Sequence, residues 1–262
     1  MPLLLNGTNI NNVLFNGNQL ETVQINGNAV WTRKAPSVDV PSGTVVFDSV
    51  KNGKSIAGTT QITIEDEGAY NVAIVGAGGG GAAWLYRWST SPNYWRSSSA
   101  AGGAGGYFYN QIILTQGVYT VEVGRGGDAS DYTLNNDAAS KPAYPGIVTA
   151  NSGGNSSLSG PSGTWISYGG TGGSCGNGTA TGGSGGSGQT SNGKKGGTGV
   201  ANYGVTRTIE NGGNYIYTWA TGGSNASDYG QGGGANSEYY TSSGPFVHAN
   251  GGVNGYVKIV KA

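Results

Sequence analysis

The chain has 262 residues, of which 53 are glycine and only 10% are charged. Its 13 basic and 13 acidic residues balance, which argues against nucleic acid or an anionic membrane as the main partner, because either would require a basic surface. The single cysteine, Cys175, excludes a disulfide within the chain and a multi-cysteine zinc site.

The chain begins Met-Pro-Leu-Leu-Leu, with no basic stretch and with too short an apolar run for a secretory signal. No segment approaches the roughly 18 apolar residues of a membrane span. We therefore expect a soluble protein that is made in a cytoplasm.

Residues 1–34 contain a repeat with a period of ten, marked by Asn6-Gly7, Asn16-Gly17 and Asn26-Gly27. Asn-Gly supplies the positive φ angles of a two-residue hairpin turn, so the repeat predicts a meander of very short strands. Apolar residues recur in step with the turns, at Leu3, Leu5, Ile10, Val13, Phe15, Leu20, Val23, Ile25 and Val30. Such short strands bury little surface, so we expect this region to dock on another domain or on a partner, or to be a small structural cap.

Residues 35–61 read as a linker with one strand at 44–50, and residues 62–75 as two strands around a Glu67-Gly68 turn. From residue 76 onwards the composition changes to repeated glycine runs. We count ten of them, at 76–81, 102–106, 124–127, 153–154, 169–173, 182–188, 196–199, 222–223, 230–234 and 251–255.

Isolated glycine runs should stay flexible, because glycine loses the most backbone entropy on folding. A polyproline-II-like helix has three residues per turn and no internal hydrogen bonds, so side-chain-free helices of this kind can pack together and bond one another. The chain is too rich in aromatic residues for an inert linker. No segment has helical periodicity with caps. We therefore predict a mostly β and irregular fold with essentially no α-helix, in which about ten polyglycine-II helices form a layered slab.

If consecutive runs are antiparallel, the linkers between them alternate between the two ends of the slab. The linkers at 82–101, 128–152, 174–181, 200–221 and 235–250 are mostly long and irregular. Five irregular loops should then project from one end. The intervening linkers are shorter or hairpin-like, as at 107–123.

Two motifs resemble nucleotide-binding sites by chance. Gly76–Gly81 matches a dinucleotide fingerprint but is not followed by a helix, and Gly188–Lys195 lacks the Ser or Thr of a phosphate-binding loop. His248 and Cys175 have no recognisable catalytic partner, and no pair stands out among the loop carboxylates Asp128, Asp131, Asp137 and Glu238. We predict no enzymatic activity, no cofactor and no metal.

The irregular linkers are rich in Tyr, Trp and Arg among Ser, Gly and Asn, which is the composition of binding hot spots and of antibody loops. Some of these aromatic side chains could instead form small cores under the loops. The predicted receptor-binding residues are Trp84, Tyr86, Arg87, Trp88, Tyr94, Trp95, Arg96, Tyr132, Tyr144, Tyr203, Tyr215, Tyr217, Trp219, Tyr239, Tyr240 and Phe246.

The glycine motifs that begin at Gly76–Gly81, the irregular segments between them and the final strand at Tyr256–Val260 resemble the adhesins at the tip of the long tail fibres of T-even-type bacteriophages. The similarity is greatest to adhesins of Salmonella-infecting relatives. It covers residues 62–262 by pattern, and the Asn-Gly repeat is similar to the fibre-attachment region of that family.

This resemblance implies an N-terminal attachment region at 1–61 and a receptor-binding domain at 62–262. It further implies a virion location at the fibre tip, with one copy on a trimeric distal fibre protein, and a host outer-membrane protein of the porin class as receptor. The apolar residues named above, together with Trp31, would make the fibre contact. Two alternatives stay open: a tip protein that binds or depolymerises lipopolysaccharide, and a glycine-rich structural protein.

Overall fold

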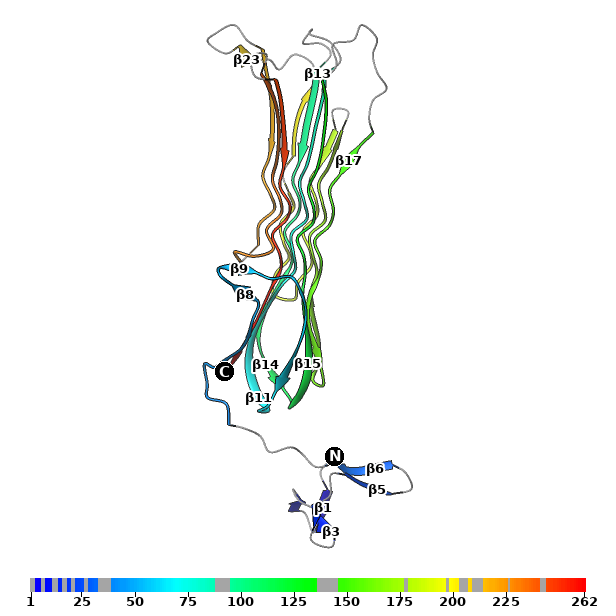
Figure 1. Ribbon diagram of the computed structural model, residues 1–262, viewed down its shortest axis with the longest axis vertical. Coiled ribbons are helices and arrows are strands. Elements are labelled where there is room, and N and C mark those ends of the chain that lie inside the picture. The colour runs from blue at the N-terminus through cyan, green and yellow to red at the C-terminus, as the bar shows by residue number, and fades with distance from the viewer. Residues whose placement is uncertain are drawn as a thin grey trace. The chain divides into compact units, whose positions relative to one another are not determined.

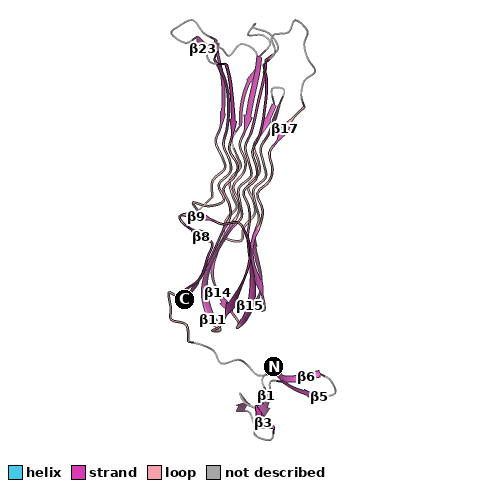
Figure 2. Cartoon of the chain, viewed as in Figure 1, coloured by secondary structure: helices cyan, strands magenta, loops and turns pink. Residues whose placement is uncertain are grey.

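The computed structural model describes residues 3–5, 8–10, 14–15, 18–19, 22–25, 28–32, 39–87, 95–135, 146–176, 179–196, 198–202, 207–208, 214–225, 227–240 and 244–262. This part of the chain contains strands, turns and extended segments and no α-helix, as predicted (Figure 2). No helix in it has the length and hydropathy needed to cross a membrane. The chain divides into two compact units, Met1–Asp39 and Val40–Ala262.

The first unit consists of three antiparallel hairpins: β1 (Leu3–Leu5) with β2 (Thr8–Ile10), β3 (Leu14–Phe15) with β4 (Asn18–Gln19), and β5 (Thr22–Ile25) with β6 (Asn28–Thr32). In each hairpin the last paired residues flank one Asn-Gly pair; Leu5, for example, lies opposite Thr8. The three hairpins confirm the turn prediction. The predicted meander is wrong in one respect, since each described hairpin is a separate two-stranded sheet. Eight of the ten predicted attachment residues lie in these strands, whereas Val13 and Leu20 lie outside the described residues.

The expected boundary between residues 61 and 62 falls inside a strand, β10 (Gly58–Ile64), and the units divide instead between Asp39 and Val40. Residues 40–61 belong to the second unit because β7 (Val45–Asp48) pairs with β27 (Tyr256–Lys261). They also contain the small hairpin β8 (Val50–Lys51) and β9 (Lys54–Ser55). The Pro and Gly residues of this segment are typical of a linker, but its strands are part of the second unit.

The middle of the second unit is a slab of glycine-rich runs joined by backbone hydrogen bonds. Run 76–81 is at its centre. Residues 76 and 79 donate to run 101–106, residues 77 and 80 to run 150–155, and residues 78 and 81 to run 250–255, at N···O distances of 2.9–3.0 Å. The same neighbour recurs every third residue, which is the period of a polyglycine-II helix.

The carbonyl groups of run 76–81 accept hydrogen bonds from three further runs, 124–129, 168–173 and 230–234. This run therefore has six neighbours. The bonds among all the described runs define three layers, with 150–155, 168–173 and 182–188 in one outer layer; 124–129, 76–81, 101–106 and 192–196 in the middle layer; and 250–255, 230–234 and 221–225 in the other outer layer.

At most glycine positions inside this slab a side chain would not fit, although the methyl groups of Ala77, Ala101 and Ala104 are buried within it. A Cβ atom placed on Gly105 would lie 1.8 Å from the carbonyl oxygen of Gly76, and one on Gly79 would lie 2.0 Å from that of Thr171. Backbone atoms cannot move aside as side chains can. Glycine is therefore required here for close approach of the backbones.

Three sheets continue the three layers at one end of the slab, which we call the distal end (Figure 1). The middle sheet is β16 (Ser130–Asn135), β12 (Ala82–Arg87), β13 (Trp95–Ala100) and β22 (Thr198–Asn202). One outer sheet is β17 (Val148–Thr149), β20 (Ser174–Gly176) and β21 (Thr179–Thr181). The other is β23 (Arg207–Thr208), β24 (Asn214–Ala220), β25 (Ala235–Tyr240) and β26 (Gly244–Ala249). In each sheet the strand order follows the order of the runs in the corresponding layer.

A two-sheet sandwich forms the opposite, proximal end. One sheet is β10, β15 (Gly117–Val123), β18 (Ser156–Gly160) and β19 (Gly163–Ser167), and the other is β14 (Tyr107–Leu114), β11 (Gly68–Val75), β27 and β7. Their inner faces enclose a core that includes Ile74, Tyr119, Leu158 and Ile259, each 0% exposed. The alternation of apolar and polar residues predicts that β10 pairs with β11 and that β14 pairs with β15, each as a hairpin. In the structure the two strands of each pair lie in opposite sheets.

The alternation of linkers between the two ends is confirmed. Runs 76–81 and 101–106 are antiparallel, whereas runs 76–81 and 124–129 are parallel. The five linkers expected at one end supply the strands of the distal sheets, except that β22 begins at Thr198, inside the expected run 196–199. Their described parts are not irregular loops, however, because each glycine run passes directly into a strand.

Candidate functional site

The distal end brings together the segments that sequence analysis singled out, and its middle sheet lies between the two outer ones. Strand β12 contacts β20 of one outer sheet and β25 of the other. Both faces of β12 and β13 are therefore covered, and the residues from Ala82 to Tyr86 and from Ser97 to Ala100 are all at most 1% exposed.

Trp84 and Tyr86 are thus core residues, at 0% and 1% exposure. Their rings are stacked, with centroids 5.7 Å apart and planes 8° apart. This burial corrects the prediction that they contact a receptor. A strand in the middle of three layers buries consecutive residues on both faces, so the absence of alternation in Ala82–Tyr86 was the available signal.

Cys175 packs against the same small core, together with Ala82, Ala100 and Ala150. Burial raises the pKa of its thiol to about 11, so the thiol stays protonated and unreactive at neutral pH. Tyr132 is partly buried against this core. No three His, Cys, Asp or Glu side chains of the described chain are grouped as a metal site requires.

The outer sheet β23–β26 has two different faces, which the register distinguishes. Ala220 pairs with Ala235, and Ala235 pairs with Ala249; Ala220 and Ala235 are 2% and 3% exposed. This face is turned toward the molecule. The neighbouring set of partners, Trp219, Asn236 and His248, belongs to the other face, and His248 is exposed.

Five predicted receptor-binding residues hold positions on that second face. From the alternation along paired strands, they are Tyr215, Tyr217, Trp219, Tyr240 and Phe246. We call this set of positions the outer aromatic face. Tyr239, which pairs with Ile216 and Pro245, holds a position on the inner face.

The polar partners on the outer aromatic face were not predicted. Glu238 lies opposite both Tyr217 and Phe246, and His248 lies opposite Asn236. The Nε2 atom of His248 is 2.9 Å from the Oδ1 atom of Asn250. In the sequence, only the alternate spacing of Tyr215, Tyr217 and Trp219 indicates this face. The residues that lie opposite them can be identified only once the pairing of the strands is known.

The remaining predicted residues fall into two groups. Arg87 and Trp95 are partners at the ends of β12 and β13, and the next pair is Tyr86 and Arg96. Trp88, Tyr94, Tyr144 and Tyr203 lie outside the described residues.

Two comparisons with known proteins bear on this chain. A family model described as a glycine-rich domain matches residues 54–259. No curated protein matches the chain.

Proposed function

We propose that this chain, which belongs to the glycine-rich domain family by its match over residues 54–259, is a non-enzymatic receptor-binding adhesin. The observation that carries the proposal is the outer aromatic face, where five Tyr, Trp and Phe positions share one face of a sheet at the end of a stiff slab. Aromatic residues with polar neighbours are typical of interface hot spots.

The slab supports this function because it holds the distal strands in fixed positions. Each run is bonded to its neighbours every third residue, so the binding strands lose little conformational entropy when a partner docks. Such preorganisation increases affinity without additional contacts.

The resemblance to tail-fibre tip adhesins of T-even-type phages extends the proposal. The three N-terminal hairpins would attach the protein, one copy per tip, to a trimeric fibre protein of the virion. The distal end would recognise an outer-membrane protein of the host, of the porin class. Each hairpin is only two to five residues long per strand, which fits a unit that is stabilised by its partner.

A cell-binding experiment tests this function. Labelled full-length protein would be incubated with bacterial cells and with isogenic mutants that lack one major porin each or the outer lipopolysaccharide core. We expect one porin deletion to abolish binding. Loss of binding only with the glycan mutant would favour a lipopolysaccharide receptor. Absence of binding to every strain would favour the alternative that the chain is a glycine-rich structural protein.

Variants locate the binding surface. Trp219→Ala should weaken cell binding by about tenfold or more, with thermal unfolding unchanged. Tyr109→Ala is the matched control, because it removes an aromatic ring from a residue that is 53% exposed at the proximal end. Equal loss of binding in both variants would contradict a distal binding site.

Deletion of residues 1–39 separates the two proposed roles. The truncated protein should still bind cells but should no longer join the fibre. Fibre attachment by the truncated protein would contradict the role of the hairpins.

A further inference from the structure

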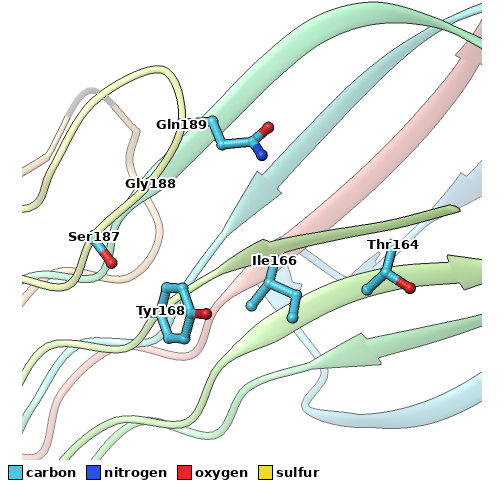
Figure 3. A pocket seen from close by; sticks show the side chains of 6 residues that line it. All are labelled: Thr164, Ile166, Tyr168, Ser187, Gly188 and Gln189. Atoms are coloured by element: carbon cyan, nitrogen blue, oxygen red, sulfur yellow. The ribbon is translucent and has the colours of Figure 1, made fainter.

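We propose a second binding site, for an uncharged carbohydrate, in a groove at the proximal end of the molecule. The groove has a volume of about 380 Å³ and is lined by Thr164, Ile166, Tyr168, Ser187, Gly188 and Gln189 (Figure 3). It lies between strand β19, which leads into run 168–173, and the turn that follows run 182–188. It belongs to the end of the slab opposite the outer aromatic face, and the proposal is independent of the adhesin function.

The chemistry of the lining selects an uncharged ligand. None of the six lining residues carries a charge at neutral pH. An anionic ligand would require cationic side chains or a cluster of backbone N–H donors. A phosphate, a carboxylate or a nucleotide is therefore a poor fit.

The groove provides an apolar platform with polar groups beside it. Tyr168 is 49% exposed, and Figure 3 shows its ring beside Ile166 on one wall, with the Gln189 amide on the other. Within the described part of the chain, the Tyr168 hydroxyl, the Ser187 hydroxyl and the Gln189 amide form no hydrogen bond to another protein group. These three groups are free to bind a ligand.

A sugar ring matches this arrangement. One face of a pyranose presents C–H groups, which pack on an aromatic ring, and its rim presents hydroxyls that both donate and accept hydrogen bonds. A side-chain amide and a hydroxyl can satisfy both kinds of group. The volume is near the lower limit for ligand pockets, so we infer a ligand of one or two rings.

The walls of the groove are fixed before any ligand binds. The Tyr168 N–H donates to the carbonyl oxygen of Ser187 at 2.9 Å, which ties the two walls together at their base. The Gly188 N–H donates to the Asn192 Oδ1 atom at 3.2 Å, and the Thr190 hydroxyl accepts from the Tyr109 N–H at 2.8 Å. Because the walls are already ordered, binding a ligand costs little conformational entropy, which increases the affinity.

The test is saturation-transfer NMR on the full chain with four neutral probes: methyl α-D-glucopyranoside, methyl α-D-mannopyranoside, methyl β-D-galactopyranoside and N-acetylglucosamine. We expect at least one probe to bind with millimolar affinity. Tyr168→Ala should weaken that binding by about tenfold, as loss of an aromatic contact predicts, and Gln189→Ala should weaken it less. Because both side chains are at the surface, neither variant should alter thermal unfolding.

Tyr109→Ala is the matched control, since Tyr109 is similarly exposed at 53% but does not line the groove. It should bind the probe like the unaltered protein. The proposal is wrong if no neutral sugar gives saturation transfer, or if Tyr168→Ala and Tyr109→Ala bind equally well. Displacement of a bound sugar by the neutral tripeptide Ser-Gly-Ser at equal concentration would instead assign the groove to an extended peptide.

Discussion

The two ends of the glycine slab continue the same backbone lattice in different ways. At the distal end each of the three layers becomes its own sheet, and the two outer sheets cover both faces of the middle one. Trp84 and Tyr86 stack there in a small core with Ala82, Ala100, Ala150 and Cys175. At the proximal end the strands form only two sheets, which enclose one core of large aliphatic and aromatic side chains. The comparison teaches that one lattice can support either a three-layer end or a conventional two-sheet sandwich.

The largest expected effect comes from breaking the lattice that both ends share. Gly105→Ala places a Cβ atom 1.8 Å from the Gly76 carbonyl oxygen, and we expect a loss of at least about 5 kcal/mol, enough to prevent folding. Gly146→Ala is the control, because nothing lies within 4 Å of the added atom. Soluble yield and urea denaturation measure the stability of both variants, and equal midpoints would mean that the lattice tolerates a Cβ atom at position 105.

Ser98→Asp should be the next largest effect, because Ser98 lies in the doubly covered middle sheet at 0% exposure. Burying an unpaired carboxylate there should cost about 3 to 5 kcal/mol and should open the distal end first. Cys175 is the chain's only cysteine, and its alkylation rate by iodoacetamide reports this opening. Faster global unfolding with Cys175 still protected would contradict separate behaviour of the two ends.

Leu158→Ala tests the proximal end alone. Leu158 is 0% exposed in the sandwich core, so its truncation should cost about 3 kcal/mol through lost burial and a cavity. Calorimetry would measure the effect, with Ile113→Ala as control, because Ile113 is 60% exposed. Alkylation of Cys175 under native conditions should be unchanged, and an increase matching that of Ser98→Asp would show that the ends unfold together.

The smallest effect is a loss of stability at alkaline pH from Tyr256, where the proximal sandwich joins the slab. Burial raises the pKa of Tyr256 to about 12 from a reference value of 10.0. Its ring stacks on that of Tyr229, with the two ring centroids 4.6 Å apart. Because the folded pKa is raised, the stabilisation is complete below pH 10 and is lost as the pH rises toward 12. In the wild-type protein the urea midpoint should fall between pH 10 and pH 12, and Tyr256→Phe should make this fall smaller. A fall of unchanged size in the variant would mean that other groups cause it.

Much of this architecture could be predicted from particular residues. The Asn-Gly pairs locate the three N-terminal hairpins, because an Asn-Gly sequence favours a two-residue hairpin turn. The glycine runs locate the slab and the alternation of its linkers. The arrangement of the layers could not be predicted, since a glycine run has no side chain that selects its neighbours. The buried strand Ser97-Ser98-Ser99 reads as a loop for a related reason: its burial comes from the layers above and below it, not from its own hydrophobicity.

The candidate site was less predictable than the fold. The aromatic residues around Trp84 and those around Trp219 have similar compositions, yet Trp84 lies in the middle sheet and Trp219 lies at an outer-face position of an outer sheet. The two groups of aromatic residues differ only in the layer to which their strands belong. That layer depends on hydrogen bonds between glycine runs that are far apart in the sequence.

The pairing of β7 with β27 has a consequence for protein engineering. The Gly43 N–H donates to the Lys261 carbonyl oxygen at 2.8 Å, and the Lys261 N–H donates to the Thr44 carbonyl oxygen at 2.9 Å. The backbone thus enters and leaves the glycine-rich unit at adjacent points, the geometry that tolerates insertion into a loop of another protein. We therefore expect that residues 40–262 can be inserted into a surface loop of another protein through two short linkers.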